Sequence, residues 1–198
     1  ILIYIKLLNY NFILGVKMLE ILYYTIGLLA VITILISLYI KNKGDANIEF
    51  KVADRTAFEV VTANPQEVIL SCKIPYINKG KQCGTIMDCF SRHYLPQEQF
   101  ANVEVKTQIE LLSAPRTDDY FEAVLVQAGT GDVLNLRVVL KTSKEEIKNV
   151  LVEMVDLPID IFYQIVARKE WFINKSRLEL KAEEIKLAMK IADELKEV

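Results

Sequence analysis

The segment CGTIMDCFSRH, residues 83–93, holds most of the side chains in this sequence that could perform chemistry. Two of the three cysteines, Cys83 and Cys89, lie there with Asp88 and with His93, the single histidine of the chain. Such a set could bind a metal, form a disulfide, or pair a thiol nucleophile with a base. Each of these sites requires the side chains to converge, so the local backbone decides among them.

The residue types in this segment favour a strand over residues 83–91, because Gly84 is followed by the β-prone run TIM. An unbroken strand places Cys83, Thr85, Met87, Cys89 and Ser91 on one face. It also separates Cys83 from Cys89 by about 20 Å and Cys89 from His93 by about 13 Å. Zinc ligands must lie within about 2.3 Å of one ion, and a disulfide needs Cα atoms about 5.5 Å apart.

We therefore predict no catalytic, metal or cofactor site in this segment, and a non-enzymatic protein. Buried, structural thiols are expected at Cys72 and at Cys83 or Cys89, because free cysteine behaves as a small hydrophobe. The alternative is a thiol-dependent enzyme or sensor that uses Cys89 and His93, if the chain bends at residues 91–92.

A long apolar segment precedes the rest of the chain. Residues 21–40, ILYYTIGLLAVITILISLYI, contain no charged side chain and reach about 30 Å as a helix, the thickness of a hydrocarbon core. Tyr23, Tyr24 and Tyr39 suit the two membrane interfaces. We predict a single-pass transmembrane anchor over residues 18–43 that contacts the lipid bilayer through residues 21–40. A buried helix and a cleaved signal peptide are the alternatives.

Residues 1–17 form a doubtful N-terminal extension: either a translated leader before a true start at Met18, or an apolar helix on or in the membrane. A start at Met18 leaves Lys41 and Lys43 after the anchor, which the positive-inside rule places in the cytoplasm. An odd number of cysteines also fits a reducing compartment. We therefore expect a cytoplasmic domain, although a genuine residue 1–17 segment would leave the orientation open.

The globular domain is expected over residues 44–173 and is predicted to be mainly β. Residues 67–77 alternate, with Val68, Leu70, Cys72, Ile74 and Tyr76 on one face. Further strands are expected at 103–112, 120–128, 133–141 and 159–168, and the second and third of these should form a hairpin through the Gly129–Asp132 turn. The NKGK segment, 78–81, is expected to turn with Gly80 at positive φ. Short strands with turns between them predict an antiparallel, β-sandwich-like and immunoglobulin-like domain.

Two helices are expected to accompany the strands. Ser143 and Glu146 form a capping box that opens an inserted helix near residues 144–155. Ser176 and Glu179 form a second one, which opens a C-terminal amphipathic helix over 174–198. Its apolar seam comprises Leu178, Ile185, Ala188, Ala192 and Leu195. This helix should either dock on its own domain or mediate self-association or partner binding.

The segment IPYINKGKQCGTIMD, residues 74–88, resembles the strand–Asn-x-Gly–strand segments of immunoglobulin-like sandwiches in membrane-anchored bacterial proteins. The resemblance covers fifteen residues and carries no functional residue over. It agrees with the fold expected from the strand pattern.

The expected function is a non-catalytic, single-pass membrane-anchored binding or scaffolding protein, and the alternative is an accessory subunit of a transporter or envelope complex. The 24 basic and 26 acidic residues are interspersed, so nucleic acid is not an expected partner. Two polar loops are the candidate protein contacts. Their contact residues are Lys79, Lys81, Arg92, His93 and Tyr94.

Overall fold

The computed structural model describes residues 2–194 except 97, 117, 119–120 and 144–145, with side chains described from residue 14 to residue 190. The chain divides into two units, residues 1–44 and 45–198, and each unit is described by itself.

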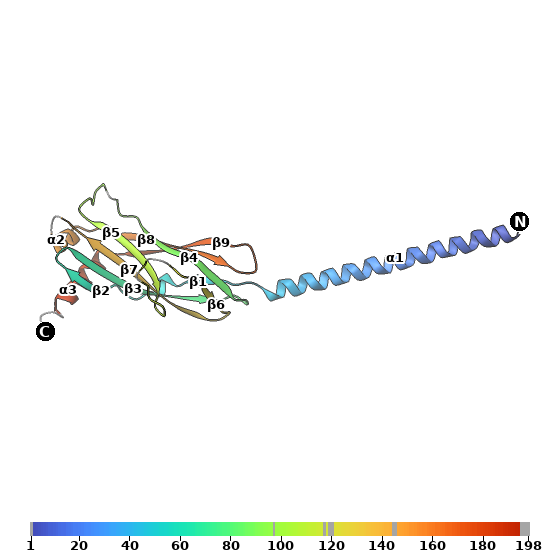
Figure 1. Cartoon of the computed structure of the whole chain (residues 1–198), viewed down its shortest axis with the longest axis horizontal. Helices are drawn as coiled ribbons and strands as arrows, with labels where there is room; N and C mark the ends of the chain where they lie inside the picture. Colours follow the sequence, from blue (N-terminus) through green and yellow to red (C-terminus); the bar gives the residue numbers. More distant parts are fainter. Residues whose placement is uncertain (1, 97, 117, 119–120, 144–145, 195–198) are drawn as a thin grey trace. The chain divides into compact units, whose positions relative to one another are not determined.

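The first unit is one helix, α1, Leu2–Lys43 (Figure 1). Its segment Leu14–Lys43 contains an 18-residue stretch with a mean hydropathy of 2.3, and no residue of that stretch is buried. Thirty residues of helix extend about 45 Å, so this segment is long and apolar enough to cross a membrane. The helix runs without interruption through residues 2–17.

The second unit is a sandwich of two antiparallel sheets (Figure 1). The five-stranded sheet has the order β1-β3-β7-β5, and β2 also pairs with β3. Its strands are β1 Ile48–Phe50, β2 Glu59–Asn64, β3 Glu67–Asn78, β5 Glu104–Leu111 and β7 Gly131–Lys141. The four-stranded sheet has the order β6-β4-β8-β9. Its strands are β4 Gly84–His93, β6 Val124–Val126, β8 Leu157–Val166 and β9 Phe172–Leu180.

Three short elements complete the unit. A 3-10 turn, η1, spans Val52–Asp54. Helices α2, Ile147–Val152, and α3, Ala182–Glu194, lie at the same end of the sandwich (Figure 1). The mainly β, immunoglobulin-like architecture with two added helices agrees with the fold class expected from the sequence.

The core forms where the inner faces of the two sheets meet, because both sheets alternate apolar and polar residues. The predicted inner face of β3 is confirmed, since Val68, Leu70, Cys72, Ile74 and Tyr76 are all buried. Its partner β7 buries the alternate residues from Leu134 to Leu140. The rings of Phe50 in β1 and Tyr163 in β8 stack across the sheets with centroids 3.8 Å apart.

The predicted hairpin between residues 120–128 and 133–141 is wrong. β6 pairs with β4 in one sheet, whereas β7 lies in the other sheet between β3 and β5. Both edges of β7 are therefore occupied. The intervening turn joins the two sheets and is tied to the end of β3, where Asn78 N–H donates to Thr130 O at 2.8 Å and Gly129 N–H donates to Asn78 O at 2.9 Å.

The NKGK segment also connects the two sheets rather than closing a hairpin, since β3 and β4 belong to different sheets. Gly80 does not have positive φ, in contrast to our expectation. Glycine is required there for a different reason. A Cβ atom at position 80 would overlap the backbone of Asp45 and would lie 2.5 Å from Asn47 N, so the glycine permits a close backbone approach.

Both predicted capping boxes fail. The cap residue of α2 is Glu146, which makes no side-chain cap hydrogen bond, so the helix begins at Ile147 and is shorter than expected. Ser176 and Glu179 lie within β9, where pairing with β8 buries Leu178 and Leu180. Tertiary burial thus outweighs the local capping signal.

The C-terminal helix α3 begins at Ala182, whose N–H donates to the Asp156 carboxylate at 2.8 Å. Ile185 and Ala188 of the predicted seam are buried, together with Met189. The Arg55 guanidinium also binds Glu184 through two hydrogen bonds of 3.0 and 2.8 Å. The described apolar side of α3 therefore packs within its own domain. The side chains of Ala192 and Leu195 lie outside the described residues.

Candidate functional site

The strand predicted over residues 83–91 is present as β4, Gly84–His93, but its side chains do not keep one face throughout. A β-bulge interrupts the pairing of β4 with β8 between Met87 and Phe90, and Asp88 has φ of 46°. The bulge turns Cys89 into the core, whereas Met87 is exposed and Cys83 lies exposed before the strand. The prediction that the alternate residues from Cys83 to Ser91 share one face of the strand is therefore wrong.

Two of the three thiols, those of Cys72 and Cys89, are in poor positions for nucleophilic chemistry. Burial raises the pKa of Cys72 to about 12 and raises the pKa of Cys89 far above its usual value, so both are protonated at neutral pH. Burial also lowers the pKa of His93, partly offset by a hydrogen bond with the backbone of Val105. Among the described residues, no group of three or more His, Cys, Asp or Glu side chains gathers where it could hold a metal ion.

The five predicted contact residues fall at opposite ends of β4. Lys79 and Lys81 lie in the loop before the strand, and Lys79 forms an ion pair of 2.5 Å with Glu49. Arg92 and His93 are the last two residues of the strand, followed by Tyr94. His93 is half-buried opposite Ile159, whereas Arg92 is exposed opposite Asp160.

The outer face of the four-stranded sheet carries an apolar patch. β8 alternates between buried residues and the outward-facing Phe162, Gln164 and Val166. Phe90 lies directly across from Phe162, and their rings stack with centroids 5.3 Å apart. We define the apolar patch as Met87, Phe90, Leu125, Phe162 and Ile173. Phe162 is half-buried, and the side chains of the other four members are between 36% and 64% exposed.

A charged cluster adjoins this patch one rung further along the same face. Asp160 is fully buried beneath the Arg177 guanidinium, which donates hydrogen bonds of 2.6 and 3.0 Å to its two oxygens. Lys175 Nζ lies 3.1 Å from the same carboxylate. The Arg177 guanidinium also lies over the Tyr94 ring, 5.4 Å from its centroid. Together with Arg92, which lies opposite Asp160 in the neighbouring strand, these residues form the charged cluster, in which Arg177 and Lys175 contact the carboxylate.

The Asp160 carboxylate makes part of the stability of the domain dependent on pH. The hydrogen bonds from Arg177, and then those from Lys175 and Tyr94, hold its pKa well below the ordinary value of 3.8. A depressed pKa in the folded state stabilises the protein above pH 4 and loses that contribution as the pH falls below it.

We predict that Asp160→Asn lowers the free energy of unfolding at pH 6 by about 1 kcal/mol. The loss is this small because Lys175 and Arg177, the two cations that contact Asp160, are half exposed and solvent screens their charges. The difference from the natural protein should shrink at pH 3, because the Asp160 carboxylate of the unfolded chain takes up a proton there while the carboxylate of the folded chain is still ionised. Denaturant unfolding at the two pH values measures this. Glu104→Gln, in the exposed Glu104–Lys106 pair, is the control and should change the stability little. A stability difference between Asp160→Asn and the natural protein that stays constant from pH 6 to pH 3 would contradict the role assigned to the charge of Asp160.

The outer face of the other sheet differs in character. Its outward residues on β5 and β7 include Lys106, Gln108, Glu110, Asn135 and Arg137. Several are paired in this sheet, as in the 2.8 Å hydrogen bond from Asn135 to Glu110. The exposed aromatic and aliphatic side chains beside arginine on the four-stranded sheet match the composition of protein interfaces more closely.

Arg92 and Tyr94 of this face were predicted as contact residues from the sequence, but its other members were not. Asp160 and Phe162 were assigned to a strand without a distinction between its two faces. The signal was present in IDIFYQIV, where alternation sets Asp160 and Phe162 opposite the apolar Ile159, Ile161 and Tyr163. An acid and a phenylalanine on the polar side of a strand indicate a face that is neither core nor ordinary solvated surface.

The chain was compared with known proteins. No protein-family model matches it, and no curated protein matches its sequence. Among solved structures, it is similar to the ApaA protein from Bordetella pertussis, with a TM-score of 0.39 and 11% identity over 69% of this chain and 94% of that one. It is also similar to a FixG-related protein from Vibrio parahaemolyticus, with a TM-score of 0.34 and 12% identity over 69% and 94% of the two chains. A third similar structure is the GAE domain of GGA2p from Saccharomyces cerevisiae, with a TM-score of 0.29 and 10% identity over 64% of this chain and 99% of that one.

Proposed function

We propose that this protein is a membrane-anchored, non-catalytic binding protein that docks a partner protein on the outer face of its four-stranded sheet. The observation that carries the proposal is the adjacency of the apolar patch and the charged cluster on that face. Large exposed apolar side chains on a folded domain mark interaction sites when they lie together and are bordered by charge.

The chemistry of the face defines the partner. The apolar patch offers the stacked rings of Phe90 and Phe162, flanked by aliphatic side chains. The charged cluster offers the three cations Arg92, Lys175 and Arg177 and the single carboxylate of Asp160. A complementary surface therefore carries apolar side chains next to acidic ones. Electrostatic complementarity of this kind fixes the register and accelerates association.

The anchor in this proposal is α1, because Leu14–Lys43 has the length and hydropathy of a membrane span. With a start at Met18, Lys41 and Lys43 at the end of the helix favour the cytoplasmic side for the domain by the positive-inside rule. The protonated, buried thiols support a non-catalytic role.

Position-specific photo-crosslinking in the cells that make the protein tests the docking face. A photoreactive amino acid in place of Phe90 should give one discrete adduct, and the same group in place of Lys106 on the other sheet should give none. Ile173→Asp should abolish the Phe90 adduct, and Arg92→Gln should weaken it. The crosslinked partner should present acidic side chains beside its apolar contact. Equal adducts at both positions, or an adduct that survives Ile173→Asp, would overturn the proposal.

A further inference from the structure

The turn between β8 and β9, residues 167–171, contacts Asp45, which follows closely after the end of α1 in the sequence. The Asp45 carboxylate accepts hydrogen bonds from the backbone N–H groups of Arg168 and Lys169, each at 3.2 Å. Asp45 lies two residues after Lys43, the last residue of α1. Two residues span at most about 7 Å, so covalent geometry keeps this turn near the point where the apolar helix ends.

The side chains of this turn and of the strand that follows have the composition of a membrane-interface segment. Trp171, Phe172 and Ile173 are consecutive and are 61%, 46% and 64% exposed. Arg168 and Lys169 precede them, with Glu170 between the basic and the apolar residues. Tryptophan is enriched at the membrane–water interface, where its ring sits among headgroups, and basic side chains bind anionic lipid.

The end of α1 has the same chemistry. Lys43 Nζ lies over the Tyr39 ring, 5.6 Å from its centroid, and Lys41 lies two residues before Lys43. If α1 spans a bilayer, this aromatic and basic segment lies in the headgroup layer, because the apolar span ends there. The turn is then within covalent reach of that same layer.

We propose that the β8–β9 turn seats the domain on the membrane that holds α1, with Trp171 and Phe172 inserted among the lipid headgroups and Arg168 and Lys169 bound to anionic lipid. The inference rests on the membrane anchoring in the proposed function. It adds a second, peripheral attachment point for the domain. Such a contact restricts how the domain and its docking face are presented to a partner.

Trp171 is the only tryptophan of the chain, so its fluorescence reports directly on this contact. The full chain is reconstituted in lipid nanodiscs of phosphatidylcholine, with and without phosphatidylglycerol. Bromine-labelled acyl chains quench a tryptophan in the lipid, and acrylamide quenches a tryptophan in water. Strong quenching by brominated lipid and weak quenching by acrylamide are expected, more so with the anionic lipid. The double variant Arg168→Glu, Lys169→Glu should lose the effect of the anionic lipid.

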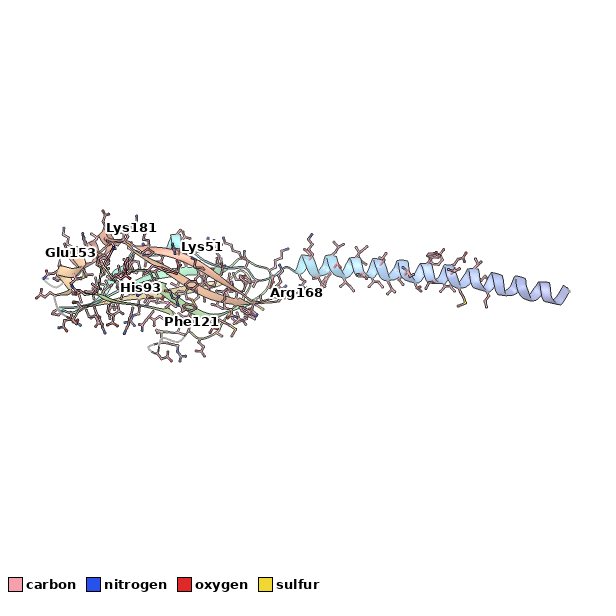
Figure 2. The ribbon with its side chains drawn as sticks, turned by 90° about the horizontal axis from the view of Figure 1, so that it is seen from above. Lys51, His93, Phe121, Glu153, Arg168 and Lys181 are labelled. Atoms are coloured by element: carbon pink, nitrogen blue, oxygen red, sulfur yellow. The ribbon has the colours of Figure 1, made fainter. Side chains whose placement is uncertain are left out.

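The control places the reporter at the other end of the domain. In Figure 2 Arg168 and Glu153 lie at opposite ends of the sandwich, and the neighbour of Glu153, Val152 in α2, is 64% exposed. The double variant Trp171→Phe, Val152→Trp should therefore be quenched by acrylamide and not by brominated lipid.

Integration of α1 is scored separately, by flotation of proteoliposomes in alkaline carbonate. A chain that carbonate extracts would overturn the membrane anchor, and this inference with it. An integrated chain in which Trp171 behaves like the Val152→Trp reporter would overturn this inference alone and leave the anchor intact.

Discussion

Asn78→Ala is expected to lower the free energy of unfolding of the β domain by about 4 kcal/mol, the largest loss that we predict for one polar side chain. Asn78 is fully buried, and its amide makes four hydrogen bonds. The side-chain oxygen accepts from Asn47 N at 3.0 Å and from Gly80 N at 2.9 Å. The side-chain nitrogen donates to Gln82 O at 2.8 Å and to Val126 O at 3.1 Å.

These four bonds join segments that the sequence places far apart. They connect the chain before β1, the loop between the sheets and the end of β6 at a single point. Alanine removes all four bonds and leaves four backbone groups without that partner, which costs more than the net worth of the bonds. The variant Asn78→Asp keeps the acceptors but sets a carboxylate oxygen against the carbonyl oxygens of Gln82 and Val126 in a buried site, so a loss at least as large as that of Asn78→Ala is expected.

The measurement uses the buried thiols as reporters of unfolding. In a Cys83→Ser background, Cys72 and Cys89 should react with a thiol reagent only when the domain opens. Labelling of the full chain in detergent micelles at increasing denaturant then gives the stability of each variant. Asn135→Ala is the matched control, because Asn135 makes a single described side-chain hydrogen bond, on the outer face. A loss for Asn78→Ala no larger than the loss for Asn135→Ala would contradict the prediction.

Gly131→Ala is expected to cost about 3 kcal/mol, because there is no room for a side chain at the start of β7. A Cβ atom at position 131 would overlap Tyr76 O and would lie 2.9 Å from Tyr76 C and 3.0 Å from Ile77 Cα. These are backbone atoms of the paired strand β3, so a rotamer change cannot relieve the contact.

The neighbouring glycine provides a control with a different physical origin. Gly129 has φ of 73° and open space around its Cβ position, so Gly129→Ala should cost only about 1 kcal/mol, through backbone strain. The same thiol-labelling assay compares the two variants. Equal losses would show that steric overlap at position 131 is relieved by movement of β3.

Alternation in the sequence was enough to predict the long inner strands. Leu70 and Leu136, for example, are directed into the core by a period of two that both strands keep over their whole length. The sheet to which a strand belongs was not predictable in the same way. Residues 124–126 pair with β4 and not with β7, because β7 already pairs with β3 and β5. The local sequence does not indicate which strands compete for an edge of β7.

The candidate site shows the same division. Arg92 and Tyr94 stood out as polar and aromatic residues near a turn, but their neighbours come from strands about 70 residues later in the chain. The ring stacking of Phe90 on Phe162 depends on the register of β4 with β8 and on the bulge at Asp88. Neither the register nor the bulge follows from the residue types, since a shift of one residue would turn the phenylalanines to the other face.

If α1 anchors the domain in a membrane, the position of β9 at the edge of its sheet has a consequence for crowding. An anchor confines copies of a protein to two dimensions, where exposed strand edges of neighbouring molecules meet often and can pair into aggregates. β9 carries Lys175, Arg177 and Glu179 along its length, and Arg177 is fixed in place by Asp160. Two such edges paired antiparallel about Arg177 would set the two arginines opposite each other and force them to lose water. In the proposed anchored state, the ion pair beside the proposed docking face therefore also keeps neighbouring domains apart.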